Sequence, residues 1–542
     1  MPPVRSANLC WGQHHHVLRY LAAPAASRHE AHIATSYPLP PGCTTEHVRA
    51  ALTHLVRRHE GLRTVYDLNA APWPRQLVRP PAPPPMVEVS VEQDPAAEVR
   101  RLTETPFDLA AEGPLRACLI TSGDQLRRLH LVFNHLAFDD VALDQLSAEL
   151  DALLAARVAG RPAALPPVAD QPVDLATREA GTHPETALAH WREEIRALPT
   201  DIHAARRTAT GTAARAAEPA AHSASLTVPG LLAATRAIAA NAHVWPAAVH
   251  VAGYAVALAA HTGRRRVPHR LYTSQRAASA LPSVLTCMSH PLLCALDLTD
   301  DPPFSEVLRR AATRVRQAMA NGHVPFDRID ELVAAESARR GQSVRVASEL
   351  NFLDNAPRSC RTGRDRFVWN AAPLDWARAG SDLYLRVYEW SDGVTLALQA
   401  LDEIADRAAV ERFLRGYAAL LTAHADPTVD LRVEEAVRLV GLTPPAETAT
   451  PAPADATPGA APHPAHPALA AAVAEVNGLD LVDLADSYPA AGGRLLRLPR
   501  VLAALADRGW TGTLGDLAAP RPLRAVADTL RPCPPSNSGR TR

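Results

Sequence analysis

The stretch Leu-Val-Phe-Asn-His-Leu-Ala-Phe-Asp-Asp occupies residues 131–140 and is the part of the chain that decides the fold. Residues 126–133 alternate basic and apolar side chains and then become apolar, which predicts a strand that enters a core. Residues 141–155 carry leucines on one helical face, which predicts an amphipathic helix. His135 and Asp139 are therefore expected in a tight loop between strand and helix, where an imidazole can be held rigidly at a cavity.

The spacing of His135 and Asp139 suggests a chemical role for this loop. A histidine with a carboxylate four residues later is the smallest set that provides an oriented base for acyl transfer. The pattern alone is weak, because a single histidine of this kind is more often a hydrogen-bonded core residue. Other motifs have to support the interpretation.

Four further groups of residues accompany the loop in a fixed order along the chain. They are Arg58-His59-Glu60-Gly61-Leu62-Arg63-Thr64, then Thr105-Pro106-Phe107-Asp108-Leu109 with Gly113-Pro114-Leu115-Arg116, then His190-Trp191-Arg192, and last Gly322-His323-Val324-Pro325-Phe326-Asp327. With this order and spacing, the sequence resembles the condensation domains of nonribosomal peptide synthetases. These belong to a superfamily of acyltransferases similar to chloramphenicol acetyltransferase. The resemblance extends from about residue 5 to residue 430.

The resemblance implies an α/β fold class with two α+β two-layer lobes. In that family the two chloramphenicol-acetyltransferase-like lobes form a V with a central tunnel. We expect the N-terminal lobe, with the active-site motif, at residues 1–175 and the C-terminal lobe at residues 176–435. Residues 383–390 and 394–400 alternate around Ser-Asp-Gly at 391–393, which predicts a β-hairpin in the second lobe.

The same resemblance assigns roles to residues of the loop. His135 matches the second, catalytic histidine of the family pattern His-His-x-x-x-Asp-Gly. It can act as a general base on the acceptor or as a hydrogen-bond partner to the tetrahedral intermediate, and the sequence leaves both roles open. Asp139 matches the structural aspartate that pairs with an arginine, and Arg63 matches that arginine. A surface arginine at the end of a helix is the alternative for Arg63.

Two residues depart from the family pattern. Asn134 replaces the first histidine, and its amide can form hydrogen bonds without supplying a titratable group. Asp140 replaces the glycine and adds a carboxylate close to His135. That carboxylate can raise the pKa of His135 or bind a cationic acceptor such as a basic amino acid, or it can simply cap the helix that starts at Val141.

The C-terminal part of the chain predicts a linker, a small helical domain and a tail. We expect a Pro/Ala-rich linker at 436–467, a helical bundle at 468–530 and a disordered tail at 531–542. Ala-Gly-Gly-Arg-Leu-Leu at 491–496 resembles the carrier-domain motif Leu-Gly-Gly-x-Ser-Leu, in which the serine bears phosphopantetheine. Leu495 stands at the serine position and has no nucleophilic oxygen, so the domain is interpreted as a degenerate carrier. An unrelated helical bundle is the alternative.

The amino-acid composition argues against several kinds of partner and several types of reaction. The chain has 542 residues and a formal net charge of −1, which favours neither a nucleic-acid partner nor a membrane surface. Its seven cysteines form no Cys-x-x-Cys pair, which fits reduced thiols and a cytoplasmic location. The sequence contains no lysine, so it lacks the residue used for Schiff bases, phosphate loops and carboxylate adenylation. A partner must therefore deliver an acyl group that is already activated.

No bound cofactor or metal is expected. Phosphopantetheine would arrive on partner carrier proteins. Adjacent histidines point to different sides of a helix or strand, so the run His14-His15-His16 is not expected to bind a metal ion.

Three hypotheses for function follow. The favoured one is a free-standing condensation enzyme of nonribosomal peptide biosynthesis that joins a carrier-bound acyl or aminoacyl thioester to a small-molecule or carrier-bound amine, with partners in trans. The second is an ester-forming or soluble-acceptor acyltransferase of the same fold. The third is a catalytically silent docking protein of a synthetase. Unusual residues at the active-site motif and carrier motif favour the third, whereas joint retention of His135, Asp139 and Arg63 argues against it.

Overall fold

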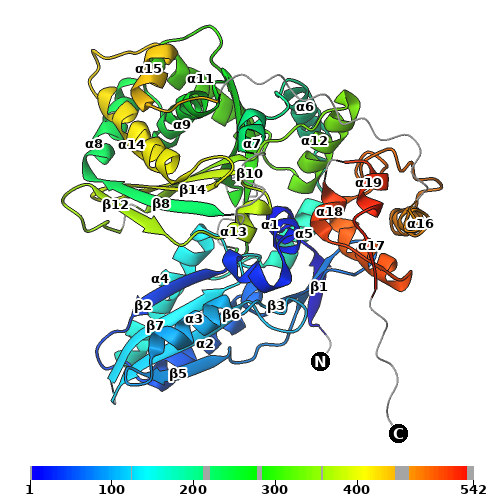
Figure 1. Ribbon diagram of the computed structural model, residues 1–542. Coiled ribbons are helices and arrows are strands. Elements are labelled where there is room, and N and C mark those ends of the chain that lie inside the picture. The colour runs from blue at the N-terminus through cyan, green and yellow to red at the C-terminus, as the bar shows by residue number, and fades with distance from the viewer. Residues whose placement is uncertain are drawn as a thin grey trace.

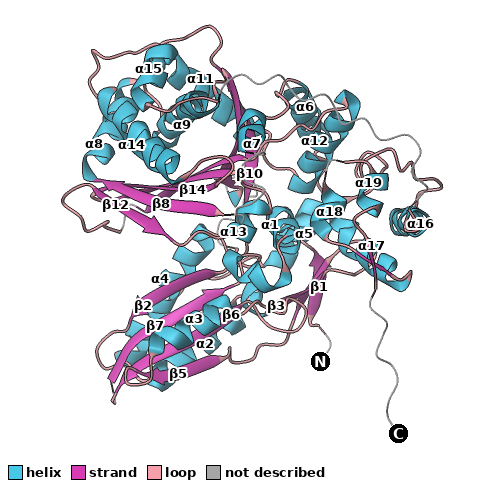
Figure 2. Cartoon of the chain, viewed as in Figure 1, coloured by secondary structure: helices cyan, strands magenta, loops and turns pink. Residues whose placement is uncertain are grey.

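Two α/β lobes and a smaller helical module make up the protein (Figures 1 and 2). The computed structural model describes residues 3–123, 125–210, 220–276, 284–355, 358–445, 463–519 and 521–533. Within these residues, no single helix is long and apolar enough to cross a membrane. Helices α8 (Pro229–Asn241) and α9 (Pro246–Thr262), bent by 102° at the break between them, pass that test of length and composition only as a pair.

The first lobe is built on a four-stranded sheet with the order β2-β7-β6-β5. Its elements are β2 (Ile33–Pro38), α2 (Thr45–Arg58), β5 (Met86–Ser90), α3 (Pro95–Glu104), β6 (Leu115–Ser122), β7 (Gln125–Phe133) and α4 (Asp140–Val158). Leu129, Leu131 and Phe133 of β7 pack into one core with α2 and α4, because side chains alternate along a strand. The predicted strand, loop and helix around residues 131–140 are confirmed.

A three-stranded sheet with the order β1-β4-β3, two α-helices and two 3-10 helices accompany the first lobe. The elements are β1 (Arg5–Asn8), α1 (Trp11–Ala22), η1 (Ala25–Ala31), η2 (Glu60–Arg63), β3 (Thr64–Asp67), β4 (Arg75–Val78) and α5 (Pro172–Ala180). Helix α5 packs against β1, and its residues Leu175 and Ala176 share an apolar cluster with Cys10. The boundary expected between residues 175 and 176 therefore falls inside a helix.

The second lobe contains a seven-stranded sheet with the order β10-β9-β11-β13-β14-β8-β12. Its strands are β8 (Ala221–Val228), β9 (Arg266–Ser274), β10 (Ser289–Asp297), β11 (Ser348–Asn355), β12 (Arg366–Asn370), β13 (Leu383–Trp390) and β14 (Gly393–Leu401). Its helices are α6 (Glu185–Arg196), α7 (Ala204–Thr210), α8 (Pro229–Asn241), α9 (Pro246–Thr262), α11 (Phe304–Ala320), α12 (Phe326–Arg340), α13 (Leu374–Arg378), α14 (Arg407–Ala423) and α15 (Val433–Val440). The predicted hairpin is confirmed as β13 and β14.

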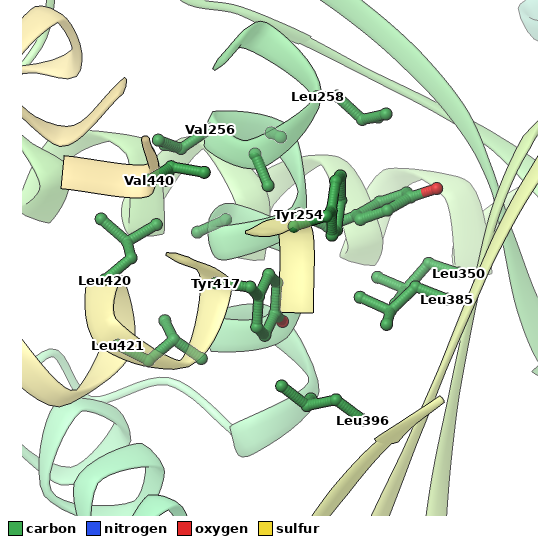
Figure 3. Close-up of a cluster of buried hydrophobic side chains, with 14 of the residues drawn as sticks. Tyr254, Val256, Leu258, Leu350, Leu385, Leu396, Tyr417, Leu420, Leu421 and Val440 are labelled. Atoms are coloured by element: carbon green, nitrogen blue, oxygen red, sulfur yellow. The ribbon is translucent and has the colours of Figure 1, made fainter. Parts of the chain in front are cut away.

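Helices α8, α9 and α14 cover the face of this sheet that is turned away from the first lobe, and α15 packs on α9 and α14 (Figure 1). Tyr254 of α9 and Tyr417 of α14 pack there opposite leucines of the strands, among them Leu385 of β13 (Figure 3). Along β13, buried residues alternate with half-buried ones, which lie on the opposite face. That face carries Tyr384 and Arg386.

The end of the second lobe differs from the prediction. The linker was expected from residue 436, but α15 continues to Val440, and Ala436 and Val440 are buried in the core of the lobe. Amphipathic helix α15 therefore belongs to the lobe. The central part of the expected linker, residues 446–462, lies outside the described residues.

The C-terminal module has an apolar core of its own. Its elements are α16 (His466–Asn477), η4 (Leu495–Arg497), α17 (Leu498–Asp507), β15 (Trp510–Thr511), α18 (Leu514–Ala518), α19 (Leu523–Ala527) and β16 (Arg531–Pro532). Strand β16 pairs with β15, so residues 531–532, expected in the tail, belong to the module, and residues 534–542 lie outside the described residues. Leu18 and Leu21 of α1 pack against its core.

Candidate active site

The loop between β7 and α4 is shaped by its own side chains. Asn134 is buried, and its Oδ1 atom accepts a hydrogen bond of 2.9 Å from the backbone N–H of Leu136. The backbone N–H of Ala137 donates to the carbonyl oxygen of Asn134. The chain therefore turns tightly here and presents His135 at the turn.

Asp139 fastens this loop to the second lobe. Its Oδ1 atom accepts hydrogen bonds from Nη2 of Arg276 at 2.7 Å and from the backbone N–H of Ala142 at 2.8 Å. Its Oδ2 atom accepts one of 2.9 Å from the backbone N–H of Met288. Arg276 also donates to the carbonyl oxygens of Val284 and Thr286. The carboxylate is thus both the N-cap of α4 and the acid of an interlobe ion pair.

The expected pairing of Asp139 with Arg63 is wrong. Arg63 donates instead to the carbonyl oxygens of Val56, at 3.1 Å, and Arg79, at 2.6 Å. Its nearest carboxylate is that of Glu60, at 3.8 Å. Arg63 follows α2 and donates to one carbonyl oxygen of that helix and to another just after β4, and among the described residues it forms no ion pair with Asp139.

His135 is half-buried and lies between α1 and the segment before β10. Its ring stacks on that of His16 with centroids 4.2 Å apart and planes 18° from parallel. Its Nδ1 atom lies 3.9 Å from Sγ of Cys287. Burial lowers the pKa of His135, and the charges of Asp140 and Asp139 oppose this only in part. At neutral pH the imidazole is therefore uncharged and able to accept a proton.

The three consecutive histidines point to separate partners, as expected for adjacent residues of a helix. Nδ1 of His14 lies 2.7 Å from Oδ1 of Asp327, and Nε2 of His15 lies 3.1 Å from the hydroxyl of Tyr272. Nε2 of His16 donates to the carbonyl oxygen of Ser289 at 2.9 Å.

His16, His135 and Cys287 form a group that the sequence analysis did not identify. Their ligand atoms lie within 4.8 Å of one another, and two imidazoles with a thiol are ligands that Zn²⁺ accepts. The imidazole planes are nearly parallel, so their lone pairs run side by side instead of converging. Burial raises the pKa of the Cys287 thiol well above its usual value. Cys287 is thus a neutral neighbour of His135.

Asp140 does not cap α4, which was one of the roles considered for it. The cap of α4 is Asp139, and Asp140 is the first helical residue. It is exposed and, among the described residues, has no hydrogen-bond or ion-pair partner. The surrounding protein still removes part of the water around the carboxyl, which raises the pKa of Asp140, whereas the nearby His135 lowers it. One turn further along α4, Asp144 forms an ion pair of 2.8 Å with Arg358, which lies beyond β11 in the second lobe.

Helix α1 connects this loop to the sheet of the second lobe. Arg19 forms a buried ion pair of 3.1 Å with Glu349 of β11 and also donates to the hydroxyl of Tyr272. The ring of Tyr272 lies 5.7 Å from that of Tyr384 on β13. The face of the sheet that carries Tyr384 and Arg386 therefore looks toward α1 and the loop of His135.

The carrier-like motif of the module is buried against the lobes. Leu495 is 5% exposed, and its backbone N–H donates to Oε1 of Glu331 on α12 at 3.1 Å. Arg494 forms an ion pair of 2.9 Å with the same carboxylate. A cavity of about 530 Å³ lies between module and lobes and is lined by His15 and Leu514, among others. His135 does not line this cavity, so the central tunnel stays a prediction.

The sequence profile named condensation domain matches residues 24–436. The chain belongs to the condensation-domain family. Phosphinothricin tripeptide synthetase PhsC from Streptomyces viridochromogenes is 30% identical over 305 residues, which cover 53% of this chain and 27% of that synthetase. This condensation protein thus matches about a quarter of the length of PhsC.

Solved structures show the same fold. The condensation domain from the monacolin K polyketide synthase MokA superposes with a TM-score of 0.63 at 17% identity, covering 79% of this chain and 100% of that one. The X-domain in a complex with OxyB from teicoplanin biosynthesis superposes with a TM-score of 0.60 at 22% identity, covering 80% and 96%. Condensation domains of nonribosomal peptide synthetases are enzymes of the acyltransferase type. Membership of this family supports, in general terms, an amide-forming condensation of carrier-bound substrates.

Proposed function

We propose that this protein joins a carrier-bound acyl or aminoacyl thioester to an amine acceptor, with His135 as the catalytic residue. The observation that carries the proposal is the fixation of a neutral, partly exposed imidazole between two lobes. Asp139 holds the loop of His135 to Arg276 and to the backbone of Met288. A base positioned in this way needs little reorganisation when a substrate arrives.

In the proposed reaction, the amine nitrogen attacks the thioester carbonyl carbon. A C–N bond forms, the C–S bond breaks, and the carrier thiol leaves with a proton. His135 accepts a proton from the amine, or donates a hydrogen bond to the tetrahedral intermediate. Either role agrees with a lowered pKa of His135 and with its position beside the exposed Asp140.

Partners in trans are part of the proposal. The chain has no lysine for carboxylate adenylation, and Leu495 at the carrier motif is both unreactive and buried. We therefore infer that the phosphopantetheine arm comes on another protein and that the module is a degenerate carrier retained for docking or stability. All seven cysteines are free thiols, which supports a reducing, cytoplasmic setting.

Product identity tests the proposal against its alternatives. Purified protein would be mixed with an acyl-loaded carrier and a panel of amines and alcohols, and products would be detected by intact mass. An amide that depends on His135 supports condensation, and an ester would support the alcohol-acylating alternative. Binding of the loaded carrier without any product would support a silent docking role. His54→Ala is the matched control, since His54 is an exposed histidine on α2.

A further inference from the structure

Arg386 is a cation without an anionic partner among the described residues, on the face of the sheet that looks toward His135; its guanidinium lies 5.4 Å from the ring centroid of Tyr384. It lies on β13 among half-buried residues, between Tyr384 and Tyr388 on the same face. Its Nε atom is buried without a hydrogen-bond partner, and no carboxylate of the described residues pairs with it. Because a half-buried guanidinium with a buried, unbonded Nε gains from a hydrogen-bonded anion, this position suits an anionic ligand.

Asp140 belongs to the other lobe, and a neighbouring interlobe ion pair brings its part of α4 close to the sheet that carries Arg386. The pair of Asp144 with Arg358 joins α4 to the segment beside the β13–β14 turn, where Ser391 bonds to the carbonyl oxygen of Arg358. Asp140 lies one turn before Asp144, on the same side of α4. Electrostatics agrees with this placement. Burial lowers the pKa of the Arg386 guanidinium, but neighbouring acidic groups outweigh burial and raise that pKa; they are Tyr388, Tyr384 and Asp140.

An unpaired anion next to the catalytic histidine and an unpaired cation on the sheet face that looks toward this histidine match a particular class of acceptor. We propose that the acceptor is a free α-amino acid, with its ammonium group bound at Asp140 and its carboxylate bound at Arg386. The planar guanidinium suits a carboxylate because it offers paired N–H donors. This inference rests on the proposed function and adds to it the substrate class.

The charge of Arg386 distinguishes a free acceptor from a tethered one. In an amino acid bound to a carrier, the carboxyl group is a neutral thioester and gives Arg386 no anion. The module of this chain cannot tether an acceptor at its carrier motif, since Leu495 replaces the serine. A free amino acid satisfies both charges at once.

The reaction balances with this acceptor. The amino acid first loses one ammonium proton, and its nitrogen then attacks the thioester carbon. The C–N bond forms and the C–S bond breaks, while the second proton passes by way of His135 to the departing thiol. The products are an N-acyl amino acid, a carrier thiol and one proton released to solvent.

Calorimetric binding of free amino acids to the full chain tests the inference without any donor. The probes are the protein amino acids, and each one that binds is compared with its methyl ester and with the matching α-hydroxy acid. In the wild type, loss of either charge from the probe should weaken binding about tenfold or more, as expected for hydrogen bonds to charged groups.

Variants identify which residue binds the ammonium group of the amino acid and which binds its carboxylate. Arg386→Met should bind the acid and the ester equally, and Asp140→Asn should bind the amino acid and the hydroxy acid equally. Arg386→Lys keeps the charge and should retain part of the preference for the acid. Arg415→Met, at an arginine paired with Glu411 on α14, should change nothing. Wild-type preference for the ester, or full preference for the acid in Arg386→Met, would overturn the inference.

Turnover separates this inference from the proposed function. If only a carrier-bound aminoacyl acceptor reacts, and no free amino acid binds, the inference fails and condensation stands. If free amino acids bind with the expected dependence on Arg386 but no donor carrier is ever deacylated, the proposed function fails and the binding site stands.

Discussion

Oδ1 of Asp139 lies 2.7 Å from Nη2 of Arg276, so the loop that carries His135 in one lobe is held by an arginine of the other. Both side chains are almost fully buried. The position of His135 therefore depends on contacts between the two lobes. A change in how the two lobes pack against each other would therefore also move the imidazole of His135.

Removal of one partner of this pair should destabilise the protein strongly. Asp139→Ala should cost roughly 3–5 kcal/mol in unfolding free energy, because it leaves the buried charge of Arg276 uncompensated. Urea denaturation measures the cost. A double-mutant cycle of Asp139→Ala with Arg276→Ala should give a coupling of about 0.5–3 kcal/mol. Asp139→Ala with Arg63→Ala should be additive, and a coupling there would contradict the observed pairing.

The pH dependence of the reaction should change when Asp140 is neutralised. If the neutral form of His135 acts as the base, as one of the two proposed roles requires, activity should rise as pH increases through the pKa of His135, which burial holds below its usual 6.5. Asp140 partly opposes that lowering. Asp140→Asn should therefore shift the acidic limb of the pH–rate profile, and the NMR titration of His135, to lower pH. A shift to higher pH would show that Asp140 does not act on His135 by charge.

Cys287 should be dispensable for the chemistry. Its thiol lies 3.9 Å from Nδ1 of His135, but burial raises its pKa and keeps it protonated. Direct attack of the amine on the carrier thioester needs no acyl-enzyme. Cys287→Ser should retain activity within about tenfold, and intact mass during turnover should show no acylated protein. An acyl adduct lost in Cys287→Ser would point to covalent catalysis instead.

A serine at position 495 should not create a site for phosphopantetheine. Leu495 is 5% exposed, and its backbone is bonded to Glu331. Leu495→Ser incubated with coenzyme A and a phosphopantetheinyl transferase should gain no mass, since the transferase cannot reach the buried side chain. Leu495→Ser combined with Glu331→Ala and Arg494→Ala, which releases these contacts, is the comparison. Modification of the single variant would mean that the module opens readily.

The sequence predicted those parts of the site that depend on local patterns. The alternation in β7 and the leucines of α4 are periodic, and they located His135 between the two elements. The partner of Asp139 was assigned wrongly because Arg276 is 137 residues away and no local pattern connects the two. His16 and Cys287 were missed for the same reason, since only tertiary packing brings them to His135.

Short-range details also escaped the sequence. Asp139 and Asp140 are both good helix caps, and only backbone geometry shows that the first of them accepts from the N–H of Ala142. The end of the second lobe was placed within α15 because the Pro/Ala-rich composition nearby concealed a short amphipathic helix. Arg386 was not singled out, because an unpaired charge is recognised only when its surroundings are known.

The central claim is that His135 promotes acyl transfer from a carrier to an amine. The most direct test is the single-turnover rate of amide formation from an acyl-loaded carrier, measured for wild type, His135→Ala and the control His54→Ala. The account expects His135→Ala to lose about 10²–10⁴ in rate while it still binds the loaded carrier, with His54→Ala unchanged. Equal rates for His135→Ala and wild type would contradict it.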